Sequence, residues 1–552
     1  MTALIPRRSG ELQPVVTPAE VSLPTSGPLL FPDAARSMGI HIMGGKGSGK
    51  SILMALGFAW FDFHRGIPTI VFDPIGTVTD YFLGRLLYLS KEDQRALGKR
   101  VLYVDMAGAN NRVVPFPLYY RLGNESLYEV SQRFLDVVKK TDPYLQIAPL
   151  EGWNQVWRTG TYTGQVLSAL GYQITEAESL LRHPAHWAAE LRQASSQHSE
   201  LLPAVEFFRG MGQADERLRI RRTETFFTKI AYFALDPIQK AMFGAATPGI
   251  NWQQVMDQRM MVLLDFRHEH SLEGRRFKMV WALKLLLDFI RRRGPGRFLP
   301  ISLIVDELTE LLAADPVSQN LLAADIDELV NVLARNYRLW VTLAHQELFQ
   351  VEERLQKTLM SMGTQILGVT SDPDTATNLA HRYFRYQPNW VRKYEPVWMA
   401  SPHIPGISEY RMPSVVDYRS HEFTLEEQRL LKSYEFTNLR QFEFLVRPAL
   451  GEGNTQGSLK RVDIASLVEG KYPDAKQVDT ARNLLMERDG QNADDLLKEI
   501  AARRQSTTTI PEVVAPQPLP SRRSKLPGSA EEDEPFVFGE KATAAQAKTR
   551  HA

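Results

Sequence analysis

Short apolar runs recur along the chain, and each is followed by a polar turn. They are rich in β-branched residues and read GIHIM (39–43), PTIVFD (68–73), VLYVDM (101–106), MMVLLDF (260–266), ISLIVD (301–306), LWVTLAH (339–345) and TQILGVT (364–370). Near-continuous apolar runs of this length are typical of strands buried on both faces of a sheet. Helical patterns separate several of them, so the chain is predicted to be α/β with a mainly parallel central sheet.

The strand pattern disappears in the middle of the chain, between residues 113 and 258. Apolar residues there recur at helical spacing, notably in 126–140, 153–173 and 221–235. We therefore expect 113–258 to be a mostly helical insertion. The sheet-forming core that it divides is expected at 37–112 and at 259–470, the second part with a C-terminal extension.

The two ends of the chain differ from this core. Residues 1–36 are rich in Pro and turn residues, which predicts an extended arm. Residues 471–504 are predicted to be helical, with Asn492 as an N-cap. From 505 to 552 the chain is Thr, Pro, Ala and charge, which predicts disorder. Its EEDEPFVFGE stretch (531–540) is either a solvated tail or a segment that docks on a partner.

Composition and hydropathy add four points to this picture. The chain has 552 residues, 43% hydrophobic and 23% charged, which is ordinary for a globular protein and predicts one large domain with insertions, or two domains, together with tails. A net charge of +1 means that any nucleic-acid surface must be a local patch. The sequence has no cysteine, which excludes disulfides, thiolate zinc sites and cysteine nucleophiles. No apolar run approaches the roughly 18 residues of a membrane span, so we expect a cytoplasmic protein with no span of its own.

The stretch MGGKGSGKS (43–51) has the spacing G-x-x-x-x-G-K-S, and it stands between a predicted strand and an apolar helix. Glycines let backbone N–H groups converge on phosphate oxygens, and the helix N-terminus adds positive charge. The predicted nucleotide-binding residues are Gly44, Gly45, Lys46, Gly47, Ser48, Gly49, Lys50 and Ser51. Lys50 is expected to bridge the β- and γ-phosphates, and Ser51 to bind Mg²⁺. The alternative is a glycine turn followed by an incidental Lys-Ser.

A second acidic site follows the strand ISLIV. Asp306 and Glu307 stand at its carboxyl end. Downstream of a phosphate loop, the first acid is expected to hold Mg²⁺ and the second to activate the attacking water. The alternative is a pair of acids at a helix N-terminus, where negative charge is favoured.

Three further polar residues lie beyond the acids. Gln346 ends the strand LWVTLAH, where a polar side chain can sense the γ-phosphate. Arg335 and Arg338 precede that strand, and either is a candidate arginine finger for a neighbouring subunit. A turn-forming glutamine and surface arginines are the alternatives.

Two basic clusters are candidate DNA contacts. They are Arg217, Arg219, Arg221 and Arg222 in one stretch, and Arg291, Arg292 and Arg293 in the other. Such clusters can neutralise phosphates and release counterions, but they are also typical of a solvated helix face.

In this order the motifs resemble the HerA/FtsK superfamily of ring-forming, DNA-pumping ATPases. The nearest likeness is to the conjugative coupling ATPases of type IV secretion (TraG/TraD-like). Over about 39–385, the stretches that carry it are SMGIHIMGGKGSGKS, PTIVFDPIGTVTD, LDPIQKAMFG, INWQQVMDQRMMVLLDF, LIVDEL, LARNYRLWVTLAHQELFQV and ILGVTSDPDTATNLAHRYF. The resemblance implies a RecA-like P-loop NTPase core, ATP and Mg²⁺, a homo-hexameric ring, and DNA in its pore. It also implies that 113–258 corresponds to the coupling proteins' all-α domain.

Two departures from that family affect the expectation. Coupling proteins usually carry N-terminal transmembrane helices, and this sequence shows none, so a membrane-anchored or secretion-channel partner would have to recruit it to the inner face of the membrane. Gly45-Lys46 stands where relatives often have Pro-Thr, at positions that contribute mainly backbone. The predicted function is an ATP-driven DNA translocase. The alternatives are a HerA-like end-processing or segregation helicase, and an ATP-dependent oligomerisation switch without translocation.

Overall fold

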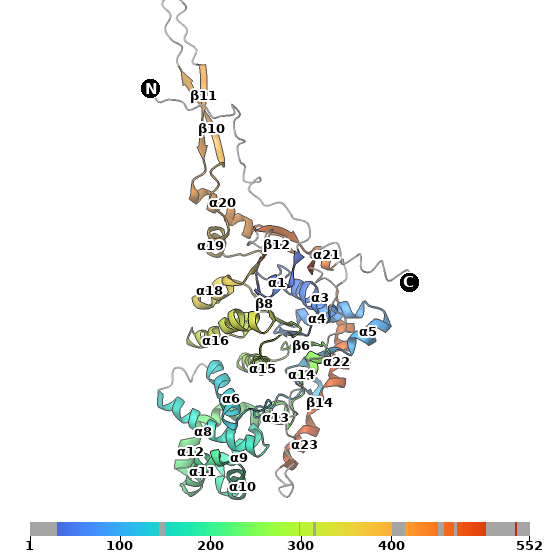
Figure 1. Ribbon diagram of the computed structural model, residues 1–552, viewed down its shortest axis with the longest axis vertical. Coiled ribbons are helices and arrows are strands. Elements are labelled where there is room, and N and C mark those ends of the chain that lie inside the picture. The colour runs from blue at the N-terminus through green and yellow to red at the C-terminus, as the bar shows by residue number, and fades with distance from the viewer. Residues whose placement is uncertain are drawn as a thin grey trace, which may run out of the picture.

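A nine-stranded sheet in the order β13-β12-β9-β2-β8-β7-β3-β6-β4 organises the molecule. The structure is a computed structural model that describes residues 30–142, 150–296, 298–312, 316–399, 414–450, 458–468, 472–503 and 536–537. Figure 1 shows an elongated molecule, with the sheet at its middle, a group of helices at one end and a β-hairpin at the other.

The seven predicted strands all form, and they are parallel to one another. They are β2 (Ile40–Met43), β3 (Thr69–Asp73), β4 (Val101–Asp105), β6 (Met261–Asp265), β7 (Ile301–Val305), β8 (Leu339–His345) and β9 (Thr364–Leu367). Every residue in them is buried, which is why the runs lack polar alternation. The prediction of an α/β fold with a mainly parallel sheet is therefore confirmed.

Two antiparallel strands extend the sheet beyond β9. They are β12 (Glu443–Arg447) and β13 (Lys460–Asp463). The sequence did not reveal them, because β12 has charged ends and β13 is a mostly polar edge strand, KRVD.

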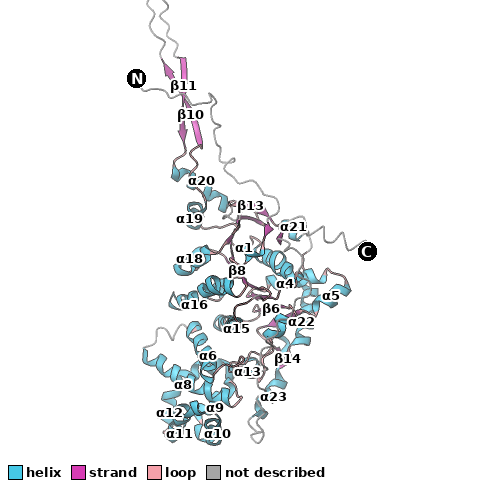
Figure 2. Cartoon of the chain, viewed as in Figure 1, coloured by secondary structure: helices cyan, strands magenta, loops and turns pink. Residues whose placement is uncertain are grey.

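Helices cover both faces of the sheet, as Figures 1 and 2 show. On one side lie α15 (Leu272–Arg293), α16 (Pro316–Glu328) and α18 (Glu353–Ser361); on the other lie α3 (Trp60–His64), α4 (Thr77–Leu87) and α22 (Ala475–Asp489). The helix predicted after the glycine loop is α2 (Lys50–Ile52), a π-helical stretch (Leu53–Ala59) and α3 in succession. It ends at Gly66, whose φ of 71° is the left-handed conformation of a glycine stop.

The described residues between β5 (Arg112–Val113) and β6 are mostly helical, with loops at 114–126 and 245–251. The longer helices are α6 (Leu127–Thr141), α8 (Leu150–Ala169), α9 (Ala177–Arg182), α10 (Ala188–Gln197), α11 (Leu202–Gln213), α12 (Glu216–Leu235), α13 (Pro237–Gly244) and α14 (Trp252–Asp257). Phe134 of α6 and Phe233 of α12 both contact Phe277 of α15, with ring centroids 6.2 and 4.7 Å away. The helical part thus shares one apolar core with the sheet layer, and the domain boundaries at 113 and 258 stay a prediction.

A long hairpin leaves the body between α19 (Pro373–Tyr383) and α20 (Leu425–Thr437). Its strands, β10 (Val391–Met399) and β11 (Ser414–Glu422), pair antiparallel and project from the end of the molecule (Figure 1). The sequence did not predict this hairpin, because a hairpin without a core face lacks the apolar alternation that marks a strand.

The ends of the chain are described in part. In the predicted extended arm, Asp33–Arg36 form the short helix α1 instead, and the buried Arg36 donates to Asp62 at 2.9 and 2.6 Å. β1 (Leu30–Phe31) pairs with β15 (Phe536–Val537); the rest of the predicted disordered tail, 505–552, lies outside the described residues. In the C-terminal helices, Asn492 accepts from the backbone of α23 (Ala493–Arg503), as an N-cap does.

None of the helices in the described part of the chain combines the length and the apolar character needed to cross a membrane.

Candidate active site

The predicted phosphate loop connects β2 to α2 at the carboxyl edge of the sheet. Gly47 and Gly49 have left-handed φ values of 82° and 100°. A Cβ on Gly49 would lie 2.7 Å from Phe442, so both conformation and space require glycine there. Lys46 and Gly47 are exposed, while Ser48 is buried. The loop therefore folds into the concave turn that phosphate binding needs.

Lys50 points back into this loop. Its ammonium donates to the carbonyl oxygens of Gly44 at 2.5 Å and Gly45 at 3.3 Å. Burial lowers the pKa of Lys50, and the carboxylates of Glu307, Asp306 and Glu347 oppose that shift. The ammonium is thus held by neutral carbonyls that phosphate oxygens could replace.

Ser51 and Asp306 meet across the site. The Ser51 hydroxyl donates to Asp306 Oδ2 at 2.8 Å, and the Asp306 N–H donates to Phe72 O at 3.0 Å, which continues the sheet. Among the described residues, no group of three or more His, Asp or Glu could hold a metal by itself. A hydroxyl and one carboxylate fit Mg²⁺, which usually takes its remaining ligands from phosphates and water.

Glu307 is held at both carboxylate oxygens. Gln346 Nε2 donates to one at 2.9 Å and Thr309 Oγ1 to the other at 2.6 Å. The φ of Glu307 is 52°, an uncommon conformation for a residue with a side chain and one that clusters at functional sites. β8 lies between the loop strand β2 and the acid strand β7, so Gln346 at its end stands between the two motifs.

Arg335 and Arg338 are not brought to this site within the chain. Both are exposed, and Arg338 precedes β8 while Gln346 follows it. At about 3.3 Å per residue, the length of the strand separates the two ends by about 20 Å. Arg338 instead donates to Phe298 O at 3.1 Å. A role as a neighbouring subunit's finger stays a prediction.

Sequence reasoning gave no role to Asp73, which ends β3 at the same edge. Its carboxylate accepts from the N–H groups of Gly76 and Thr79, both at 2.7 Å, and so caps α4. Burial raises the pKa of Asp73 to about 7, with further contributions from Asp265 and Asp306. The sequence held a signal for this residue, because the carboxyl ends of parallel strands meet at one edge.

A buried histidine pair joins the strands behind the loop. The Gln365 amide donates to the carbonyls of Leu359 and Met362, so its oxygen must accept from His41 Nδ1 at 2.6 Å. His41 Nε2 then accepts from His345 Nε2 at 2.8 Å. Burial lowers the pKa of His41 to about 4, so both rings stay neutral and lock β2, β8 and β9 together.

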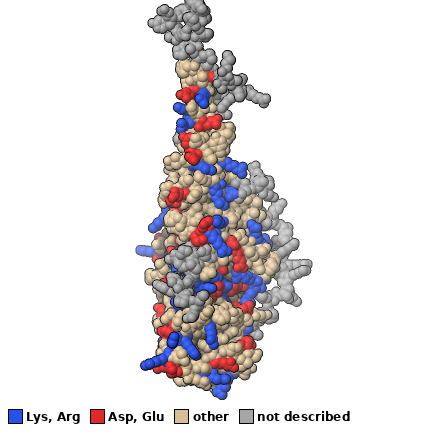
Figure 3. Space-filling model, turned by 90° about the vertical axis from the view of Figure 1, so that its left-hand side faces the viewer, with Lys and Arg blue, Asp and Glu red and all other residues tan. Residues whose placement is uncertain are grey.

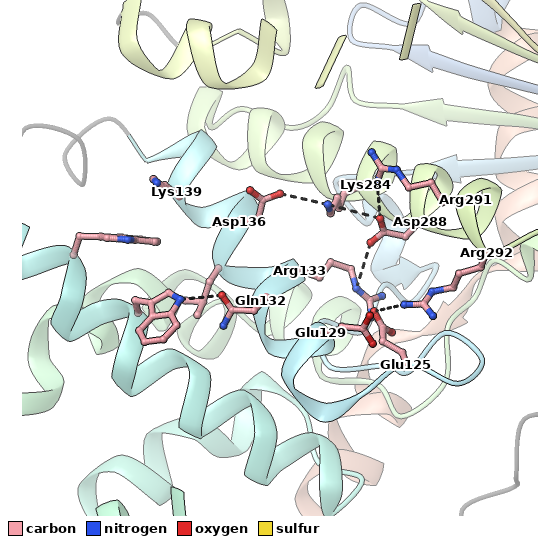
Figure 4. A pocket seen from close by; sticks show the side chains of 13 residues that line it. Glu125, Glu129, Gln132, Arg133, Asp136, Lys139, Lys284, Asp288, Arg291 and Arg292 are labelled. Carbon is pink, nitrogen blue, oxygen red and sulfur yellow. Dashed lines mark hydrogen bonds and ion pairs between the residues drawn. The ribbon is translucent and has the colours of Figure 1, made fainter. Parts of the chain in front are cut away.

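Two arginines of the cluster at the end of α15 are bound to acids of their own chain. Arg291 pairs with Asp288 and Glu328, and Arg292 lies 3.3 Å from Glu125. Figure 4 shows these two arginines beside a cavity between α6, α8 and α15, the volume of which is about 820 Å³. Arg293 donates to the Tyr337 carbonyl, a neutral partner. The charges of Arg291 and Arg292 are therefore largely compensated within the chain.

The arginine cluster of α12 differs from that of α15 in its exposure to solvent. Arg217, Arg221 and Arg222 are exposed, and Arg219 is half-buried. On the face in Figure 3, Lys and Arg alternate with Asp and Glu, which agrees with the low net charge.

Replacing Asp306 by Asn is expected to make the nucleotide-free protein more stable at pH 8 but not at pH 3.5. Burial raises the pKa of Asp306 from 3.8 to about 6, opposed first by the Ser51 hydrogen bond. A carboxyl with a raised folded-state pKa destabilises the folded protein progressively as pH rises from 3.8 toward 6. Below pH 3.8 the carboxyl is protonated in both the folded and the unfolded state, and the stability difference between the wild type and the variant vanishes.

At pH 8 the free energy of unfolding of Asp306→Asn is expected to exceed that of the wild type by up to about 3 kcal/mol, as measured by urea unfolding. Asp257, which is exposed, supplies the control: Asp257→Asn should show no pH-dependent difference. A stability difference between the variant and the wild type that is the same at both pH values would contradict the burial of an ionised Asp306.

No protein-family model matches the chain, and the curated proteins give no match. Among solved structures, it is similar to the unbound bacterial conjugative coupling protein TrwBdeltaN70, at 15% identity and a TM-score of 0.45, over 78% of this chain and 86% of that one. It is also similar to plasmid coupling protein TrwB in complex with ADP and Mg²⁺, at 14% identity and a TM-score of 0.44, over 78% of this chain and 86% of that one. The similarity to VirB4 of Thermoanaerobacter pseudethanolicus has 14% identity and a TM-score of 0.44, over 79% of this chain and 91% of that one. Identities and scores this low assign no function.

Proposed function

We propose that the protein is an ATP-driven motor that translocates DNA, working as a homo-hexameric ring of the conjugative coupling type. The observation that carries the proposal is the position of Glu307: it is held at both oxygens, next to the Ser51–Asp306 pair and the Lys50 ammonium. A fixed carboxylate beside a phosphate loop is the arrangement that water activation requires.

Each residue then has one task. Lys50 binds the β- and γ-phosphates, and Ser51 and Asp306 hold Mg²⁺, which when bound neutralises charge on the phosphate oxygens. Glu307 takes the proton of the attacking water, and Gln346 reports the presence of the γ-phosphate through its hydrogen bond to Glu307. Arg335 or Arg338 completes the site from a neighbouring subunit.

DNA is proposed to contact the exposed arginines of α12, because Arg291 and Arg292 of α15 are already paired with acids of the chain. Recruitment to the inner face of the membrane would come from a membrane-anchored or secretion-channel partner.

DNA is expected to raise the rate of ATP hydrolysis severalfold, and the stimulation should fall as salt rises, because phosphate contacts release counterions. Arg221→Ala and Arg222→Ala should each weaken DNA binding and reduce the salt dependence of log K by about 1. The control is Arg192→Ala, which removes an exposed arginine of α10. The measurements are phosphate release and DNA binding between 50 and 200 mM salt, with single- and double-stranded DNA.

A hydrolysis rate indifferent to every form of DNA would contradict translocation. Slow turnover with ATP-dependent oligomerisation would instead favour the nucleotide switch. Stimulation specifically by DNA ends would favour the end-processing helicase.

A further inference from the structure

Glu347 is a buried carboxylate directly after the sensor candidate Gln346. Its side chain is 6% exposed. Thr370 Oγ1 donates to Glu347 Oε2 at 2.6 Å, and the Ser371 N–H donates to Oε1 at 3.3 Å. These donors lie just after β9 in the chain, and the carboxylate that they hold acts on Lys50, where it opposes the lowering of the pKa by burial.

This charge lies against the outer side of the phosphate loop. Oε1 of Glu347 would be 3.8 Å from a Cβ placed on Gly45. Gly45 is one of the two residues whose carbonyls hold the Lys50 ammonium, and its N–H donates to Val369 O at 2.6 Å. Glu347 thus contacts the loop together with the segment after β9, whereas Asp306 and Glu307 follow β7, which lies on the other side of β2 in the sheet.

The three acids around Lys50 do not have the same task. Asp306 and Glu307 are assigned to Mg²⁺ and water. Glu347 is held by Thr370 and Ser371 and has no place in that chemistry. Its charge attracts the Lys50 ammonium toward the loop carbonyls and repels a bound polyphosphate.

We propose that Glu347 is a positioning residue that serves as a counter-ion for Lys50, holding the unliganded loop ready and weakening the binding of ADP so that product leaves. The inference rests on the proposed ATP hydrolysis at this loop. Glu347 acts through Lys50 and touches neither the phosphates nor the water.

Glu347→Gln is expected to bind ADP about tenfold more tightly than the wild type, because a neutral amide no longer repels phosphate. The glutamine oxygen can still accept from the Ser371 N–H, while its amide donates to Thr370 Oγ1 in place of accepting from it. Glu347→Asp withdraws the charge by one methylene and should tighten ADP binding by about twofold to threefold. Glu353→Gln, an acid 75% exposed on α18, is the matched control and should leave ADP affinity unchanged. Affinity is measured by titration with a fluorescent ADP, alongside kcat and KM for ATP.

The inference is supported if ADP binds most tightly to Glu347→Gln, less tightly to Glu347→Asp and least tightly to the wild type, and if kcat increases in the same order. A purely structural Glu347 would give weaker or unchanged ADP binding in both variants, which overturns it. If Glu347→Gln does not fold, Glu347→Asp decides by the same criterion. If the wild type itself neither binds nor hydrolyses ATP, the proposed function fails; if it does both and neither variant tightens ADP binding, only this inference fails.

Discussion

Glu307→Gln is expected to bind ATP as the wild type does and to hydrolyse it about 10²- to 10⁴-fold more slowly. The substitution suits the site, because the glutamine oxygen can accept from Gln346 Nε2 while its amide donates to Thr309 Oγ1 in place of accepting from it. The geometry is kept, and only the ability to take a proton is lost. The loss should therefore fall on kcat, with little change in the affinity for ATP.

The experiment separates binding from turnover. ATP affinity is measured by equilibrium titration with Mg²⁺, and hydrolysis by phosphate release. Glu353→Gln makes the same acid-to-amide change on the surface of α18 and should keep full turnover. Full turnover in Glu307→Gln would remove the role assigned to Glu307, whereas loss of binding would mean that the residue supports the fold of the site.

The parallel sheet was predictable because strands buried on both faces leave a local signal. β2, β7 and β8 are apolar almost throughout, and ligands bind beyond the carboxyl ends of parallel strands, so the residues directly after each strand become candidates. That rule selected Asp306 and Gln346, whereas Lys50 was selected by the spacing of the glycine loop. Applied one residue further, the strand-end rule would also have selected Glu347.

Other features depend on contacts between distant segments. The burial of Glu347 depends on Thr370 at the end of β9, and the pairing of His41 with His345 depends on which strands are neighbours in the sheet. The Arg291 and Arg292 charges looked free in the sequence, but α16 and the segment before α6 supply acids that neutralise them. A local pattern reports composition and spacing, whereas these properties depend on which elements come together.

Lys50→Ala is expected to weaken ATP and ADP binding by at least about 10²-fold, since a hydrogen bond to a charged group contributes about 1.5–3 kcal/mol and Lys50 is assigned more than one. The acids that remain around the position make the loss larger. Glu307, Asp306 and Glu347 all act on Lys50 electrostatically, so removing the ammonium leaves their negative charge facing the phosphates without compensation. Hydrolysis should fall with binding, in contrast to Glu307→Gln.

Lys46 provides the matched control, because it is the other lysine of the same loop, is expected to contribute its backbone to nucleotide binding, and has an exposed side chain. Lys46→Ala removes the same charge from the chain and should change nucleotide affinity by less than about threefold, as expected for a solvent-screened charge. Binding is measured by titration with a fluorescent ADP, and thermal unfolding checks that both variants are folded. If the two lysine variants lost affinity equally, the effect would be one of general charge, and the loop would not hold its ligand through the buried ammonium of Lys50.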